Sequence, residues 1–220
     1  MVYVDVLVLN AATFGDTQPI LQSGTSSVWA DYEHNVRSTL DMTHRFYHQN
    51  QSGGPKQKFL INVSSAAAYM WSTMNPQKPT YGLTKNAALV LLQQIAKDTE
   101  VNDMQVVSFH PGGILTEPGR KHGLREGMGF MFDDEDLPGR MAVWSASTEA
   151  KFLHGRFVWS NWDMDEIKNG PVGRQILEDE NFLKVGVEGL TEKWAGSTMD
   201  WYGLLPPSLV LEGGETETSK

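Results

Sequence analysis

Three short apolar runs alternate with two long amphipathic segments, and this alternation restricts the fold more than any other feature. The runs cover residues 3–9, 59–63 and 104–109, and the amphipathic segments between them cover residues 26–48 and 80–100. Each run has the length and apolar content of a buried strand. Strands that alternate with helices build a parallel sheet covered by helices. The sequence therefore predicts an α/β protein.

The second amphipathic segment, Thr80–Glu100, carries a tyrosine and a lysine one turn apart. Apolar residues recur at every fourth position, which predicts a helix, and Thr80 is the expected N-cap. Tyr81 and Lys85 then lie on the same face. A phenol titrates near pH ~10, and an ammonium group ~4–5 Å away would lower that pKa by about two to three units. Such a tyrosine could protonate a carbonyl oxygen or deprotonate an alcohol, although the same spacing also occurs on helices without any function.

A serine lies where it could assist this tyrosine. Ser65 comes just after the predicted strand Phe59–Val63. Ligands of open α/β sheets bind at the carboxyl ends of the strands. The Ser65 hydroxyl could therefore bind the same substrate oxygen as the Tyr81 phenol.

Together with three further motifs, these residues give the chain a resemblance to the short-chain dehydrogenase/reductase family. Five motifs occur in the family's order between Asp5 and Glu166, and the later segment GRFVWSNWDMDE is similar to a fungal branch of the family. The five are DVLVLNAA with Asn10, HNVRSTLDMTHRF with Asn35, INVSS with Ser65, YGLTK with Tyr81 and Lys85, and HPGGILTE with Thr116.

The resemblance implies an oxidoreductase that transfers a hydride between NADP or NAD and a ketone or alcohol. By this resemblance Tyr81 is the acid/base, Lys85 tunes it and Ser65 polarises the substrate oxygen. Asn35 would hold a water molecule that links Lys85 to solvent. A fungal secondary-metabolite role is associated with the same resemblance.

The resemblance also implies a set of residues that contact the cofactor and the substrate. Leu9 and Ala12 replace the Asn and Gly that are usual in the family, so the first of these motifs matches in part. Substrate-pocket residues are expected in the stretch after Ser65, where a hydrophobic loop packed on the core is an equal alternative. The cofactor set is Asn10, Ala11, Ala12, Tyr81, Lys85, Pro111, Gly112, Gly113, Ile114 and Thr116, and the pocket set is Tyr69, Met70, Trp71 and Met74.

The glycine-rich turn that opens the family's sequence, and that binds the pyrophosphate, does not occur here. Residues 5–10 correspond to the family's fourth strand, so we expect a Rossmann-like sheet that lacks the first three strands of the usual seven-stranded doubly wound sheet. Weaker dinucleotide binding follows. The alternative is a cofactor-independent descendant, either a lyase, isomerase or cyclase or a binding protein, that uses the same pocket. We expect one truncated catalytic domain over residues 1–205 and a disordered tail over residues 206–220.

Other titratable residues give no second site. His110 precedes a Pro-Gly turn and is interpreted as structural, and the acidic run Asp133–Asp136 as solvated surface. The chain has no cysteine, so it can form no disulfide, thiolate metal site or thiolate nucleophile.

The charge balance limits the partners. A formal net charge of −9 over 220 residues argues against nonspecific binding of nucleic acid or of an anionic membrane. Neither a signal peptide nor a membrane-spanning segment is recognisable, and a cytoplasmic location is expected. The family resemblance implies as partners a small carbonyl or alcohol substrate and further copies of the chain, which would associate through the two long helices.

Overall fold

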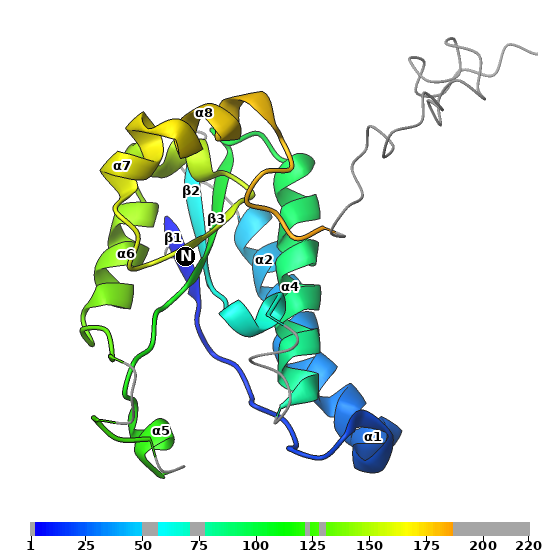
Figure 1. The fold of residues 1–220 in the computed structure, drawn as a ribbon. Helices are drawn as coiled ribbons and strands as arrows, with labels where there is room; N and C mark the ends of the chain where they lie inside the picture. The colour runs from blue at the N-terminus through cyan, green and yellow to red at the C-terminus, as the bar shows by residue number, and fades with distance from the viewer. Residues whose placement is uncertain (1–2, 50–56, 71–77, 122–123, 128–130, 187–220) are drawn as a thin grey trace, which may run out of the picture. The chain divides into compact units, whose positions relative to one another are not determined.

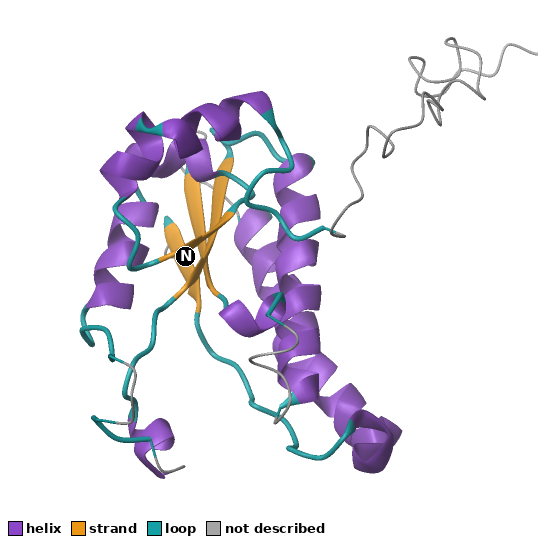
Figure 2. Ribbon diagram, in the orientation of Figure 1, coloured by secondary structure: helices purple, strands orange, loops and turns teal. Residues whose placement is uncertain are grey.

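The computed structural model describes residues 3–49, 57–70, 78–121, 124–127 and 131–186. Within these residues four parallel strands form one sheet in the order β1-β2-β3-β4, flanked by helices (Figures 1 and 2). The strands are β1 (Val6–Leu9), β2 (Lys58–Val63), β3 (Met104–His110) and β4 (Phe157–Trp159). The predicted α/β class is confirmed. The tail expected at residues 206–220 lies outside the described residues.

The sheet has an apolar layer on each face because alternate side chains of a strand point to opposite faces. On one face Leu60 and Val106 pack with Leu92 and Phe46. These two come from α4 (Pro79–Lys97) and α2 (Ser38–Tyr47). The strand positions next to Leu60 and Val106 point the other way, so both faces of the sheet are covered.

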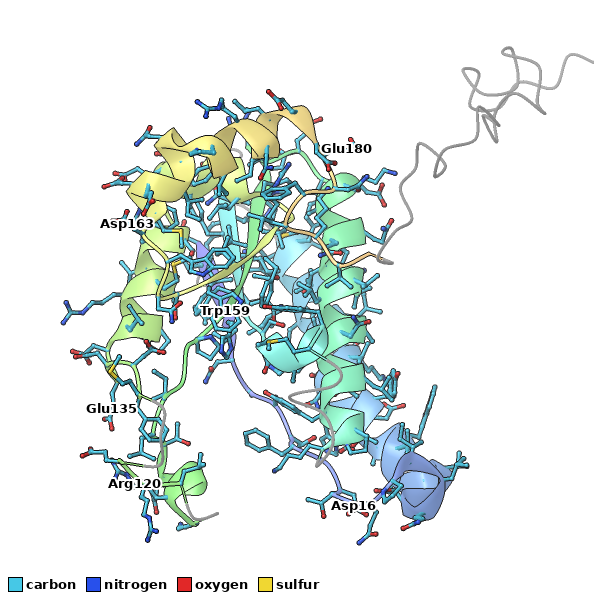
Figure 3. All side chains as sticks on the ribbon, in the orientation of Figure 1. Asp16, Arg120, Glu135, Trp159, Asp163 and Glu180 are labelled. Atoms are coloured by element: carbon cyan, nitrogen blue, oxygen red, sulfur yellow. The ribbon has the colours of Figure 1, made fainter. Side chains whose placement is uncertain are left out.

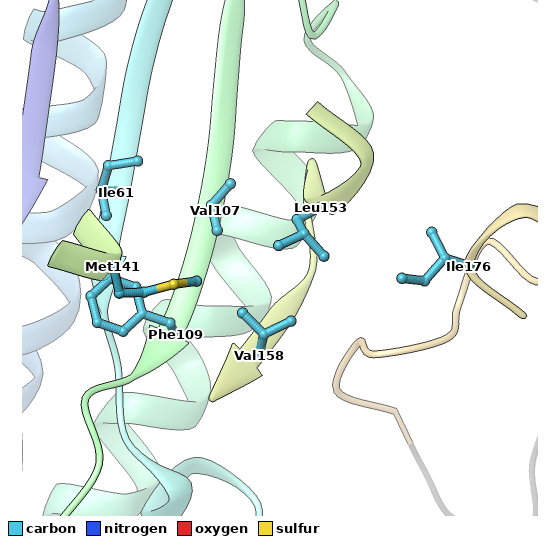
Figure 4. Close-up of a cluster of buried hydrophobic side chains, with 7 residues drawn as sticks. All are labelled: Ile61, Val107, Phe109, Met141, Leu153, Val158 and Ile176. Atoms are coloured by element: carbon cyan, nitrogen blue, oxygen red, sulfur yellow. The ribbon is translucent and has the colours of Figure 1, made fainter. Parts of the chain in front are cut away.

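Figure 4 shows the cluster on the second face, which holds Ile61, Val107 and Phe109. The residues that complete it come from elements later in the chain, and they include Met141 and Ile176. These later elements are α6 (Leu137–Ser145), η3 (Thr148–Leu153), α7 (Met164–Asn169) and α8 (Pro171–Glu178).

The first long helix is less regular than its sequence suggests. It was expected over residues 26–48, whereas α1 (Ile20–Tyr32) begins earlier. Gly24 interrupts α1 with a φ of 77°, so the regular part starts close to the expected residue. The π-helical turn η1 (Glu33–Arg37) then joins α1 to α2. Periodicity alone does not distinguish such a turn from an α-helix.

The second long helix also begins before the expected residue. Its N-cap is Lys78 and Pro79 takes the first helical position, so the prediction that Thr80 caps the helix was wrong. Proline is favoured there because its fixed φ suits a helix and its missing N–H would have had no partner in the helix. Thr80 is consequently buried within the first turn.

β1 is an edge strand among the described residues, since it pairs with β2 alone. Val6 and Val8 of β1 are exposed, as is Val4 just before the strand. No helix of the described residues is both long and apolar enough to cross a bilayer.

Candidate active site

The candidate residues lie at the carboxyl ends of the strands. Val63 of β2 pairs with Phe109 of β3, and the neighbouring His110 pairs with Trp159 of β4. The Ser64 N–H donates to the Phe109 carbonyl at 2.8 Å, which holds the turn after β2 against β3. Neighbouring strands are ~4.8 Å apart. The residues that follow these strands therefore form one row along the edge of the sheet.

Ser65 and Tyr81 meet at this edge. Ser65 caps the short 3-10 helix η2 (Ala66–Ala68), and its Oγ accepts a hydrogen bond from the Ala67 N–H at 3.2 Å. The same side chain lies close enough to the Tyr81 hydroxyl to lower the pKa of that phenol. Two hydroxyls this close can bind one substrate oxygen between them.

The predicted effect of Lys85 on Tyr81 does not hold in this structure. The pKa of Tyr81 is raised, because burial disfavours the phenolate, and the hydrogen bond from Ser65 offsets this only in part. The Lys85 Nζ is 5.8 Å from the centre of the Tyr81 ring. The prediction of a lowered pKa was wrong because it counted the attraction between charges and omitted the cost of desolvation.

Lys85 is itself buried, which lowers its pKa to about 8. Its Nζ donates to the Val63 carbonyl at 2.9 Å, so the side chain crosses from α4 to the end of β2. A lysine carries three N–H donors. The ammonium can therefore bind Val63 and still donate to a ligand beside Tyr81.

This buried lysine should make stability depend on pH. The ordinary pKa of lysine is 10.5, whereas that of Lys85 in the folded protein is about 8. Between these values the unfolded chain binds more protons, so the free energy of unfolding rises with pH. We expect a rise of about 2 kcal/mol between pH ~7.5 and ~9.5, since one pH unit within this window corresponds to about 1.4 kcal/mol.

Urea denaturation at the two pH values measures this change. Lys85→Met should remove the rise, whereas Lys97→Met, at an exposed position of the same helix, should retain it. If Lys85→Met keeps the pH dependence of the unmodified chain, the pKa of Lys85 is not its source.

Hydrogen bonds of the Asn35 side chain link the segment after β1 to α4. Asn35 is buried in η1, and its Oδ1 accepts from the Thr13 N–H at 2.8 Å while its Nδ2 donates to the Thr13 carbonyl at 2.9 Å. Nδ2 also donates to the Thr84 Oγ1 at 2.9 Å. The water-holding role expected for Asn35 stays a prediction. Its hydrogen bonds show a direct link between Thr13 and the helix that carries Tyr81.

Phe14, which follows Thr13 in the segment bonded to Asn35, contacts the ring of Tyr81. The rings of Phe14 and Tyr81 lie 5.0 Å apart. Gly15 follows with a φ of +64°, and a Cβ there would lie 2.2 Å from Asp31 Oδ2 and 2.4 Å from Thr80 Oγ1. Only glycine fits this close approach without displacing its neighbours.

Asp133 belongs to the site although the sequence analysis assigned it to the surface. Its carboxylate accepts from the Gly113 N–H at 2.7 Å, and its own N–H donates to the Gly113 carbonyl at 2.9 Å. The Asn161 Nδ2 donates to the other carboxylate oxygen at 3.5 Å. The expectation of solvated surface holds for the exposed Asp134, Glu135 and Asp136, whereas Asp133 is half-buried and bonded to Gly113. No local pattern could have found this contact, because 20 residues separate Asp133 from Gly113.

The residues expected at the cofactor lie on both sides of Ser65. Asn10, Ala11 and Ala12 follow β1 and are exposed. Pro111 to Ile114 follow β3, with Gly112 buried and Gly113 exposed. Thr116 Oγ1 accepts from the Gly119 N–H at 3.2 Å, at the start of α5 (Glu117–Lys121).

These residues fit the nicotinamide end of a dinucleotide in part. Small exposed residues after β1 allow close approach to the backbone, and Lys85 offers donors. The fit to the cofactor is incomplete because the Asp133 carboxylate already accepts a hydrogen bond from the Gly113 N–H.

An open cavity of about 860 Å³ adjoins Asp133. Its walls are Leu115, Arg120, Glu126, Gly127, Met131, Phe132, Asp133, Asp134 and Glu135. Four of these side chains are acidic and one is basic, so the cavity favours an uncharged ligand over an anion.

The expected pocket residues are described only in part. Tyr69 is 40% exposed, and its hydroxyl accepts from the Trp159 Nε1 at 2.7 Å. Met70 is half-buried. Trp71 and Met74 lie outside the described residues. The sequence pattern did not single out Trp159, which contacts Tyr69 and His110, although its place at the end of the last predicted strand was a usable signal.

Comparisons with known proteins give the family. The sequence profile "short chain dehydrogenase" matches residues 1–126. The short chain dehydrogenase/reductase nsrO of Aspergillus novofumigatus is 34% identical over 188 residues, which are 84% of this chain and 62% of that protein. A short chain dehydrogenase/reductase of Claviceps purpurea is 34% identical over 186 residues, which are 84% of this chain and 60% of its own length. The chain thus spans about three fifths of the length of these relatives.

Solved structures show the same fold at low sequence identity. A 7α-hydroxysteroid dehydrogenase complexed with NADH and 7-oxo glycochenodeoxycholic acid has a TM-score of 0.60 at 22% identity, over 71% of this chain and 62% of that one. The angucycline C-6 ketoreductase LanV with bound NADP has a TM-score of 0.57 at 19% identity, over 71% of this chain and 61% of its own. With the profile match and the 34% identical relatives, the chain belongs to the short-chain dehydrogenase/reductase family.

Proposed function

We propose that this chain is the catalytic part of an oxidoreductase that interconverts a ketone and an alcohol with NADP or NAD. The observation that carries the proposal is the contact between the Ser65 and Tyr81 side chains, with Lys85 one turn along the same helix. All three lie at the carboxyl edge of a parallel sheet, where ligands of such folds bind.

In the direction of reduction, the substrate oxygen lies between the two hydroxyls. Ser65 Oγ already accepts from the Ala67 N–H, and its single O–H, which faces the Tyr81 hydroxyl, turns to donate to the substrate oxygen when that oxygen binds. The raised pKa of Tyr81 keeps its proton in place until negative charge develops on that oxygen. Tyr81 then transfers its proton to the oxygen, and Lys85 stabilises the phenolate that forms. The bound nicotinamide supplies the hydride in this direction and accepts it in the other.

The residues after β1 and β3 would hold the cofactor. The exposed residues Ala11 and Ala12 would admit the ribose end, and the turn from Pro111 to Ile114 would receive the nicotinamide end. The carboxylate of Asp133 has to share or leave the Gly113 N–H when the cofactor binds.

A second candidate is cofactor-independent acid/base chemistry, such as a lyase, isomerase or cyclase reaction, or binding alone. One observation favours it. The carboxylate of Asp133 already occupies a backbone donor of the turn that would receive the nicotinamide. Ser65, Tyr81 and Lys85 could move protons without a hydride.

Titration with NADPH and NADH separates the two candidates. We expect micromolar binding of one nucleotide, seen as a change in nucleotide fluorescence or as binding heat. Asp133→Asn should tighten this binding, because it weakens the competing contact with Gly113. Absence of binding to the unmodified chain and to this variant at millimolar nucleotide would exclude the oxidoreductase and leave cofactor-independent chemistry.

We also propose a homo-oligomer, built through the long helices. The exposed side chains of Leu40 and Met42 on α2 support this proposal, since they leave apolar surface open to water. Light scattering should give a mass above that of one chain, and Leu40→Glu with Met42→Glu should reduce it. A single-chain mass at micromolar concentration would contradict the proposal.

A further inference from the structure

Five rings form a continuous aromatic wall beside the Ser65–Tyr81 pair. The wall consists of Tyr69, His110, Phe157, Trp159 and Trp162. Trp159 is its centre. The ring of Trp159 meets His110 edge-on at 4.5 Å and lies nearly parallel to Trp162 at 6.4 Å, with an angle of 7° between their planes. Its Nε1 donates to the Tyr69 hydroxyl, and Tyr69 in turn meets Phe157 edge-on at 5.6 Å.

The turn that carries Ser65 is held by the wall at both ends. At its start the Ala66 N–H donates to the His110 Nδ1 at 3.3 Å. At its end Tyr69 accepts from Trp159. His110 and Trp159 are also paired on neighbouring strands, and Figure 3 labels Trp159 near the carboxyl end of the sheet. A substrate whose oxygen is bound by Ser65 therefore has the wall as its neighbour along the sheet edge.

The wall carries no charge. His110 accepts through Nδ1, which places its single proton on Nε2, and burial lowers its pKa to about 4. The indole N–H of Trp159 is used by Tyr69, whose hydroxyl keeps its own proton to donate. Two donors, the Tyr69 hydroxyl and the His110 Nε2, thus interrupt an otherwise apolar surface. Phenolic or carbonyl oxygens are suitable acceptors for them.

Part of the aromatic wall is exposed to solvent. Tyr69 is 40% exposed, and Trp159 and Trp162 are both half-buried, whereas Phe109 on the same sheet is fully buried. Partly exposed rings that adjoin one another form an apolar surface of the kind that marks a ligand-binding groove. The acidic residues around the neighbouring cavity also disfavour carboxylate or phosphate substrates.

We infer that the aromatic wall binds the ring system of a planar aromatic substrate, so that the substrates are cyclic ketones fused to an aromatic ring or the corresponding alcohols. This inference rests on the proposed function and names its substrate class. Aromatic rings gain attraction from stacked and edge-on contacts with other rings beyond the burial of apolar area. A saturated ring of the same size lacks this gain, and its puckered shape fits a flat wall less well.

A matched pair of ketones tests the inference. In 2-tetralone and 2-decalone the ketone is not conjugated, and the two differ only in whether the second ring is aromatic. The unmodified chain should reduce 2-tetralone with about tenfold higher kcat/KM than 2-decalone. Trp159→Leu should bring this ratio close to one, and Trp159→Phe should keep most of it. Equal kcat/KM for the two ketones in the unmodified chain would overturn the inference and leave the proposed function intact.

A binding experiment separates failure of the inference from failure of the proposed function. The same chains are titrated with 2-naphthol and with decahydro-2-naphthol, and binding heat is measured without any cofactor. Tighter binding of 2-naphthol that is lost in Trp159→Leu supports the wall even if neither ketone is reduced. Equal binding of the two alcohols overturns it. If circular dichroism shows that Trp159→Leu is unfolded, Trp162→Leu takes its place and the same outcomes apply.

Discussion

Replacing Tyr81 with phenylalanine should lower ketone reduction by about 10²- to 10⁴-fold, the usual contribution of a positioned general acid. The change removes the hydroxyl that contacts Ser65 and would give its proton to the substrate oxygen. Stability should change by no more than about 1.5 kcal/mol, because a single hydrogen bond is lost while the ring and its contact with Phe14 remain. Steady-state kinetics at saturating nucleotide measures the loss.

The control is Tyr47→Phe, which removes a hydroxyl from an exposed tyrosine of α2. It should leave kcat and KM unchanged. Nucleotide affinity of Tyr81→Phe should stay within a few fold of the unmodified chain, so that the loss lies in kcat. A Tyr81→Phe chain that binds nucleotide and keeps kcat within about threefold would show that the acid lies elsewhere.

Replacing Gly15 with alanine should lower the free energy of unfolding by about 3 kcal/mol. About 1–2 kcal/mol comes from placing a Cβ on a residue with φ of +64°. The rest comes from overlap with Asp31 and Thr80, whose side chains are both buried and cannot turn out into water. Urea denaturation at pH ~7 measures this loss in the free energy of unfolding.

Gly24→Ala is the matched control for this change. Gly24 also has a positive φ, of +77°, but nothing lies within 4 Å of its Cβ position. With ψ of 160° it lies in a region that is almost restricted to glycine, so it should show a backbone cost of about 1–3 kcal/mol without the overlap. Phe14 lies between Gly15 and Thr13, and Thr13 is hydrogen-bonded to Asn35. The Gly15 variant should therefore also disturb the contact of Phe14 with Tyr81. A loss at Gly15 of no more than the backbone cost of about 1–2 kcal/mol would mean that Asp31 and Thr80 move aside at no cost.

The sequence contained the strands, the long helices and the spacing of Tyr81 and Lys85, because these depend on neighbours a few residues apart. An apolar run predicts a buried strand, and i, i+4 spacing places two side chains on one helical face wherever the helix packs. Ser65 could be placed at the carboxyl edge for the same reason, since it follows such a run. These expectations concern periodicity, which a linear sequence records directly.

Contacts between distant segments were decided only by the tertiary structure. Asn35 reaches Thr13 and Thr84, and Asp133 reaches Gly113, over separations that carry no periodic signal. The raised pKa of Tyr81 was decided in the same way. The attraction of a lysine one turn away follows from spacing, but the opposing desolvation depends on how much of the chain covers the phenol. Burial is a property of the packed fold, so the position of Tyr81 on its helix could be derived from sequence and the sign of its pKa shift could not.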